Sequence, residues 1–190
     1  MERRQFRTAP CSVARALDIV GDWWNPLIIR ECLYGVHRFD ALQRWLGIGR
    51  NILTRRLQTL VQQGVLERRQ YQERPTRVEY HLTDKGYEAA KVMLAMMPFG
   101  ESCCFAPGEE PIHLYSRRTG TRVQPLLVDA QTGQPLDPRH VYAGPGPSFP
   151  ADESLRRARF VDYYRRQEAL QSGETTTSTV TKVRSRRNSK

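Results

Sequence analysis

Four polar side chains recur on one side of the stretch RNILTRRLQTLVQQG, residues 50–64. At the roughly 100° per residue of an α-helix, an apolar arc forms on the other side, made by Leu53, Leu57, Leu60 and Val61. The polar set opposite this arc is Asn51, Arg55, Gln58 and Gln62. A helix about 10 to 12 Å wide fits the major groove of B-DNA, where Asn, Gln and Arg can hydrogen-bond base edges. The stretch therefore predicts a helix with one buried face and one face available to DNA.

The segment after Gly64 predicts a two-stranded ribbon that carries several arginines. Apolar and polar residues alternate on both sides of the turn QERPTR, with Leu66, Val78, Tyr80 and Leu82 as the apolar set. A ribbon beside a groove-binding helix can lay arginines along phosphates or in the minor groove. Glutamates alternate with these arginines, so part of the charge is expected to pair internally. Arg74 and Arg77 flank the tip and are the favoured phosphate contacts.

Helical patterns surround these two elements and give them a recognisable order. CSVARALDIVG predicts a first helix, and Asn25 followed by Pro26 predicts the N-cap and first residue of a second helix that ends at Gly35. HRFDALQRWLG predicts a short third helix, joined to the polar helix by the glycine turn LGIG. Thr83 is expected to cap a last helix that stops before Pro98. The predicted fold class is mainly α with a small β wing, a winged helix-turn-helix.

Charge and composition favour a polyanionic partner. The chain has 190 residues, a formal net charge of +10 and a sequence pI near 9.9. No apolar run reaches the roughly 18 to 20 residues of a membrane span, and MERRQFRTAP does not resemble a secretion signal, so a cytoplasmic location is expected. The four cysteines form no CxxC pair, and reduced thiols are expected.

Nine of the twelve prolines fall between Pro98 and Pro150, which indicates a change of organisation near residue 98. We expect a DNA-binding and dimerisation domain over residues 1–98 and a small β-rich appendage over 99–150. An amphipathic basic helix is expected over 151–172. Residues 173–190 are rich in Thr, Ser and Arg and are expected to form a disordered basic tail.

Several stretches in this order resemble the HxlR-type family of bacterial transcriptional regulators, a branch of the MarR-like winged helices. They are Cys11 to Gly21, WWNPLIIRECLYGVHRFDALQRWLGI, LTRRLQTLVQQGVLERRQY and ERPTRVEYHLTDKG. The resemblance implies a homodimer that binds double-stranded DNA at a near-palindromic operator. It also implies DNA-contacting positions at Arg50, Asn51, Thr54, Arg55, Gln58, Arg74 and Arg77.

Cys11 stands where several members of the family sense electrophiles or oxidants. A helix N-terminus favours the reactive thiolate, which supports a response to an oxidant or a small molecule. The alternative is a small apolar residue packed at the dimer interface.

The second half resembles more weakly the β appendage of longer family members, in which Cys-Gly turns resemble a zinc ribbon. Here the turns contain Thr119-Gly120 and Thr132-Gly133, with Asp129 at another cysteine position. Structural zinc prefers four Cys or His ligands in paired spacing. The appendage is therefore predicted to be metal-free, and no cofactor is expected.

The leading hypothesis is a dimeric transcriptional regulator, with repression favoured because a bound dimer readily occludes a promoter. The alternative is a winged-helix protein–protein interaction module whose polar helix binds an acidic partner. An enzyme has no support, because the chain shows no GxSxG, Walker-type loop, HExxH or dinucleotide-binding glycine pattern.

Overall fold

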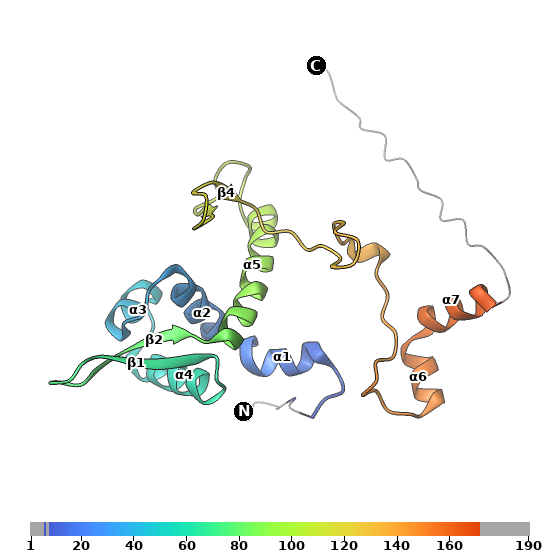
Figure 1. The fold of residues 1–190 in the computed structure, drawn as a ribbon, viewed down its shortest axis with the longest axis horizontal. Helices are drawn as coiled ribbons and strands as arrows, with labels where there is room; N and C mark the ends of the chain where they lie inside the picture. The colour runs from blue at the N-terminus through green and yellow to red at the C-terminus, as the bar shows by residue number, and fades with distance from the viewer. Residues whose placement is uncertain (1–5, 7, 172–190) are drawn as a thin grey trace, which may run out of the picture. The chain divides into compact units, whose positions relative to one another are not determined.

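The computed structural model describes residue 6 and residues 8–171, which divide into two compact units (Figure 1). The first unit runs to Pro135 and the second begins at Leu136. The predicted tail, residues 173–190, lies outside the described residues.

The first unit has the predicted order of helices and wing, which confirms the winged helix-turn-helix (Figure 1). Four helices come first: α1 (Ser12–Val20), α2 (Trp24–Tyr34), α3 (Phe39–Leu46) and α4 (Arg50–Gln62). The wing pairs β1 (Leu66–Gln72) with β2 (Arg77–Leu82) in antiparallel register, so that Leu66 lies opposite Leu82. Helix α5 (Asp84–Cys104) follows, and the Thr83 hydroxyl accepts a hydrogen bond from the Gly86 N–H as the predicted N-cap.

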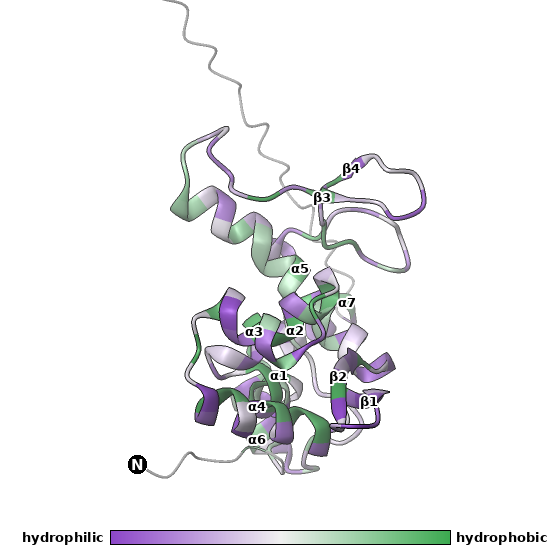
Figure 2. Ribbon diagram, turned by 90° about the vertical axis from the view of Figure 1, so that its left-hand side faces the viewer, coloured by the Kyte–Doolittle hydropathy of each residue, from purple (hydrophilic) through white to green (hydrophobic). Residues whose placement is uncertain are grey.

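The core forms where α4 packs its leucine arc against α2, α3 and the wing. Leu53, Leu57 and Leu60 are fully buried, together with Ile28 of α2 and Leu42 of α3. Burying a leucine or isoleucine side chain stabilises a fold by about 1.5 to 3 kcal/mol. Figure 2 shows hydrophobic and hydrophilic residues interleaved along these elements. The core therefore fixes the rotation of α4 about its own axis.

The start of α2 differs from the prediction. The helix begins at Trp24, and the Asp22 carboxylate accepts a hydrogen bond from the Trp24 N–H, so Asn25 is not the N-cap. Asn25 is instead buried, and its Nδ2 donates to the Ile19 carbonyl at 2.7 Å. Buried polar groups are stable only when they are hydrogen-bonded, and this contact ties α1 to α2. Asp22 also pairs with Arg56 of α4 at 2.6 Å, so Arg56 is an intradomain partner.

The prediction that the last helix stops before Pro98 is wrong. Helix α5 passes through Pro98 and ends at Cys104, so a domain boundary at residue 98 would divide a helix. Proline removes one N–H and leaves the Leu94 carbonyl without its usual donor, at a cost of about 3 kcal/mol. The helix continues because it is already nucleated by its packing on the core through Ala90 and Met93.

The appendage contains little regular structure: strands β3 (Leu114–Tyr115) and β4 (Arg122–Val123) pair in a short antiparallel ribbon. Two turns of matched geometry follow the predicted positions. The Gly120 N–H donates to the Ser116 carbonyl and the Gly133 N–H donates to the Asp129 carbonyl, and both glycines have φ near +69° (+69° and +68°). These backbone hydrogen bonds hold both turns in shape. Glycine adopts a positive φ without strain, which explains why both positions are glycine.

The second unit contains two helices instead of the single helix expected over 151–172. A 3₁₀ turn (Pro138–His140) precedes α6 (Glu153–Arg159) and α7 (Val161–Gln171). The break falls at Phe160, whose ring packs edge-on against Phe149 with 4.8 Å between centroids. Arg157 pairs with both Glu153 and Glu168, so these helices are less basic than the arginine count suggests.

Gly86 allows α5 to approach the wing closely, and we predict that replacing it destabilises the domain. A Cβ there would lie 2.3 Å from the Val65 carbonyl oxygen, which belongs to backbone and cannot move aside easily. Gly86→Ala is expected to lower the free energy of unfolding by about 1 to 3 kcal/mol. Gly100→Ala is the matched control, because open space surrounds that position in the same helix, and it is expected to stabilise by up to about 1 kcal/mol. Denaturant unfolding at one fixed protein concentration measures both; equal stability of the two variants would contradict the close approach.

Candidate nucleic-acid interface

The outer face of α4 carries all five predicted helix positions, and all five side chains are exposed. The turn before α4 sets this orientation: Gly47 adopts φ +62° after α3, and α4 begins one residue after Gly49. With the leucine arc buried, the opposite face must point to solvent. The exposed positions are Arg50, Asn51, Thr54, Arg55 and Gln58.

The arginines of this face are available to an external anion. In the described part of the chain, neither Arg50 nor Arg55 forms an ion pair, whereas Arg56, one residue further, is held by Asp22. The Arg50 guanidinium lies over the Phe39 ring at 5.3 Å from its centroid. The Thr54 hydroxyl donates to the Arg50 carbonyl at 2.9 Å, so its oxygen can still accept a hydrogen bond from a ligand. A row of exposed polar and cationic side chains on one helix face suits base edges and phosphates.

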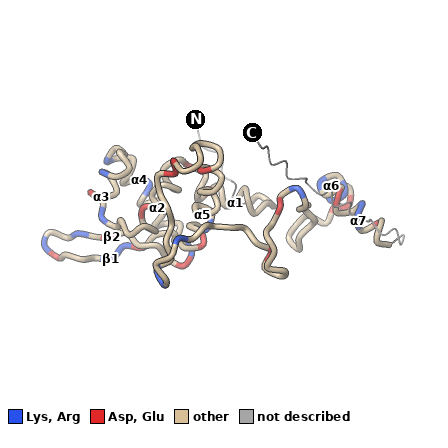
Figure 3. The backbone as a smooth tube through the Cα atoms, turned by 90° about the horizontal axis from the view of Figure 1, so that it is seen from above, with Lys and Arg blue, Asp and Glu red and all other residues tan. Residues whose placement is uncertain are grey.

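The wing tip repeats this pattern on a second element. Arg74 and Arg77 are exposed at the turn between β1 and β2, and neither pairs with a carboxylate among the residues that the structure describes. Further down the ribbon the expected internal pairing occurs, because Arg69 contacts Glu67 at 2.6 Å. Figure 3 shows basic residues along the β1–β2 hairpin. The unpaired positive charge of the wing is therefore concentrated toward its tip.

A contact between the residue before α3 and the middle of the wing was not predicted from the sequence. Arg38, just before α3, pairs with Glu79 of β2 at 2.9 Å, and its guanidinium lies 4.5 Å from the centroid of the Tyr71 ring. A hydrogen bond from Arg38, followed by one from His81, lowers the pKa of Glu79 below its ordinary value. The His37 ring stacks on His81 with 4.0 Å between centroids. These contacts fix the wing against the helix-turn-helix.

The cysteines differ in accessibility. Cys11 is exposed at the residue that precedes α1, as predicted from its position. Cys32 is buried in α2, and burial, followed by the charge of Glu31, raises the pKa of its thiol to about 12. A buried thiol with a raised pKa is chemically inert at neutral pH. Cys103 and Cys104 are also exposed, near the end of α5.

The described residues contain neither a metal-binding cluster nor a membrane-spanning helix. No group of three or more His, Cys, Asp or Glu side chains in residues 8–171 is placed to hold a metal ion. The metal-free appendage stays a prediction. Stoichiometric zinc in the purified protein would refute it. Within the same residues, no helix has the length and apolar character needed to cross a membrane.

An exposed polar helix after a glycine turn, with a basic wing beside it, defines a winged helix-turn-helix DNA-binding domain. The sequence profile of the HxlR-like helix-turn-helix family matches residues 19–106. The chain is 39% identical over 140 residues to Rv3095 of Mycobacterium tuberculosis, an HTH-type transcriptional regulator, covering 74% of this chain and 89% of that protein. The chain belongs to the HxlR-like family and is a transcriptional regulator of the helix-turn-helix type.

Two solved structures resemble this chain over a region that extends beyond the wing. PA1607, described as a candidate transcription factor, superposes with a TM-score of 0.67 and 35% identity, covering 75% of this chain and all of that one. PA1374 of Pseudomonas aeruginosa, described in the same way, has a TM-score of 0.53 and 36% identity, covering 78% and 99% of the two chains. In both cases the similarity extends past the profile match, because it covers more of the chain than residues 19–106.

We predict that Arg55 and Arg77 contribute to DNA binding in different ways. Arg55→Ala is expected to cost about 1 to 3 kcal/mol and to relax preference at one base pair, because a base-edge contact is lost. Arg77→Ala is expected to weaken binding to all sequences alike and to lower the salt slope by about one, because a phosphate contact is lost. Titration of labelled operator and scrambled DNA over a salt series measures both effects.

Arg69→Ala is the matched control for these two arginines. It removes the same charge from the same domain, but this guanidinium is already paired with Glu67. It should change affinity least of the three. If Arg55→Ala kept the affinity and sequence preference of the unaltered protein, the reading face assigned to α4 would be wrong.

Proposed function

We propose that the protein binds a near-palindromic operator as a homodimer and represses the promoter that it covers. The observation that carries this proposal is the outward face of α4, where polar side chains are exposed and the two arginines form no ion pair with any residue that the structure describes. Asn51, Arg55 and Gln58 read base edges in the major groove, and Arg50 and Thr54 contribute to the same face. Arg74 and Arg77 hold the wing on the phosphates or in the minor groove.

Exposed apolar side chains on two helices support the homodimer. Val13 of α1 is 70% exposed, and in α5 Met96 and Phe99 are 54% and 68% exposed. Contiguous apolar surface on a soluble protein marks a contact site for another protein, and we place the dimer contact at these residues. Pairing two copies through these helices presents two recognition helices to successive major grooves, about one helical turn or a multiple of it apart.

Repression follows from the size of such a complex. A dimer that spans two half-sites covers a length of DNA that RNA polymerase also needs, so a bound dimer excludes it. A regulator of the chromosome in a bacterium works in the cytoplasm, which is where we place this protein. An oxidant or electrophile is proposed as one signal for release, through Cys11, because its thiol is exposed beside α1 whereas Cys32 is buried.

Footprinting on the DNA upstream of the protein's own gene tests the function. We expect two protected lobes about one helical turn apart, which persist at salt concentrations that release a scrambled fragment. Sedimentation of the protein alone should give twice the chain mass of 22.0 kDa. Equal loss of both DNAs as salt rises would leave only nonspecific charge attraction and would refute sequence-specific repression.

Oxidant treatment of a cysteine variant tests the proposed signal. The unaltered protein is expected to release its operator on exposure to quinone or hypochlorite, whereas Cys11→Ser is expected to stay bound. The double variant Cys103→Ser, Cys104→Ser is the control, because it removes the other exposed thiols and should respond like the unaltered protein. A Cys11→Ser protein that still released DNA would remove Cys11 from the mechanism.

A further inference from the structure

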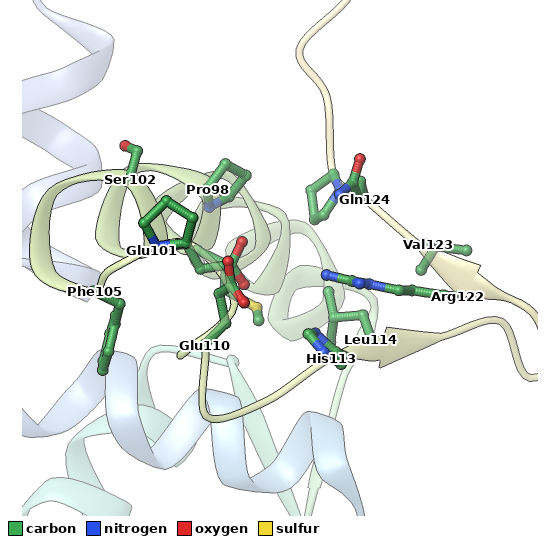
Figure 4. Close-up of a pocket in the computed structure, with 13 residues that line it drawn as sticks. Pro98, Glu101, Ser102, Phe105, Glu110, His113, Leu114, Arg122, Val123 and Gln124 are labelled. Atoms are coloured by element: carbon green, nitrogen blue, oxygen red, sulfur yellow. The ribbon is translucent and has the colours of Figure 1, made fainter. Parts of the chain in front are cut away.

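A hollow of about 510 Å³ lies between the last turns of α5 and the short ribbon of the appendage, inside the first unit (Figure 4). Helix α5 lines one side with Met97 and Glu101, and the loop and ribbon line the other with Glu110, Leu114 and Arg122. Its volume is in the range of sites that hold small organic molecules. Neither DNA contacts nor the core accounts for this space.

The charged side chains of the hollow leave an excess of negative charge. Figure 4 shows Glu101, Glu110 and Arg122 directed into the same space. Hydrogen bonds from backbone N–H groups lower the pKa of Glu110, so its carboxylate stays ionised at neutral pH. With the His113 imidazole of the lining counted as neutral, as in the formal charge of the chain, two carboxylates face one guanidinium, and neither glutamate forms an ion pair with any residue that the structure describes. An added cation would balance this excess.

The remaining walls are apolar and aromatic. Phe105 stands at the rim, 44% exposed, and an aromatic face attracts an organic cation through its quadrupole. A neighbouring hollow of about 550 Å³ shares five lining residues with the first and is walled mainly by apolar side chains of α2, α5 and the appendage. Leu33, Tyr34 and Leu94 belong to that second wall. The first hollow therefore carries the two carboxylates, and a mainly apolar hollow that also includes Arg117 lies beside it.

We propose that this hollow binds an organic cation with an apolar body, held by Glu101 and Glu110. Excess carboxylate charge selects the cation, Phe105 contacts it from the lining, and the apolar side chains Met97, Leu114 and Val123 contact the rest of the molecule. The glutamates come from α5 and from the appendage, so a bound cation bridges the two. As a regulatory signal for DNA binding, this site rests on the proposed function.

The link to DNA runs through α5. Its first half packs on α2 and approaches the wing at Gly86, and its exposed residues Met96 and Phe99 belong to the surface proposed for the dimer. Pro98 lies in the wall of the hollow and lacks the N–H that would bond to the Leu94 carbonyl. A ligand that draws the segment after Pro98 toward the appendage changes the surface through which two copies pair, and hence the spacing of their recognition helices.

Two ions of the same shape and opposite charge test the site. Tetraphenylphosphonium and tetraphenylborate are titrated calorimetrically into the full-length protein without DNA. We expect saturable binding of the phosphonium at one site per chain and much weaker binding of the borate, although the net charge of +10 favours the anion. Equal binding of both ions, or preference for the borate, would overturn the proposal.

Three variants locate the binding. The double variant Glu101→Gln, Glu110→Gln is expected to bind the phosphonium about tenfold more weakly, because two partly shielded ion pairs are lost. Glu109→Gln is the matched control, since it removes the same charge from a neighbouring residue that does not line the hollow. Arg122→Met removes the competing cation and is expected to strengthen binding. Opposite effects at one hollow cannot come from unfolding; equal weakening by Glu109→Gln would overturn the proposal.

Operator release separates this site from the proposed function. Phosphonium added to the footprinting reaction is expected to release the unaltered protein and to leave the double glutamate variant bound. Binding without any sequence-specific footprint would refute the proposed function and leave the cation site standing. A footprint with no phosphonium binding would refute the cation site alone.

Discussion

The burial of one row of leucines on α4 is the constraint on which the interface depends. Leu53, Leu57 and Leu60 have no exposed surface, so turning the helix by even one residue would bring a polar side chain into the core. Because that rotation is prohibited, the opposite face is fixed without any contact to DNA. The Asp22–Arg56 pair and the hydrogen bond from Asn25 lock the neighbouring helices around the same axis. The buried leucines therefore determine which side chains of α4 can face DNA.

Sequence reasoning predicted the elements whose signals are local. The period of the leucines gave α4 its faces, the alternation around QERPTR gave the wing, and Thr83 gave the cap of α5. The alternation of arginine and glutamate also predicted that part of the wing charge pairs internally, and Arg69 pairs with Glu67. In each case the residues whose pattern predicts the element lie close together in the sequence. The local sequence is therefore enough to predict that element.

The errors share the opposite property, because each was decided by packing that the local sequence pattern does not show. Asn25 was predicted to be a cap because Pro26 follows it. Its side chain is instead buried, and its Nδ2 donates a hydrogen bond to the Ile19 carbonyl. Pro98 was expected to end α5, but the helix passes through it. Phe160 was expected to lie inside one helix, but the chain breaks there and its ring packs against Phe149. The Arg38–Glu79 pair joins residues 41 positions apart. Local propensity is a weak prior wherever tertiary packing competes with it.

The wing is held along its strands by Arg38, whereas the arginines at its tip form no ion pair among the described residues, and this division separates two kinds of selection. Arg38, Tyr71 and Glu79 fasten the ribbon to the domain, while Arg74 and Arg77 contribute nothing to folding that the described contacts reveal. Changes at the tip and on the outer face of α4 leave the leucine core intact. A lineage can therefore adopt a new operator through substitutions that are silent for folding, and duplicated copies can diverge in the genes they control at little structural cost.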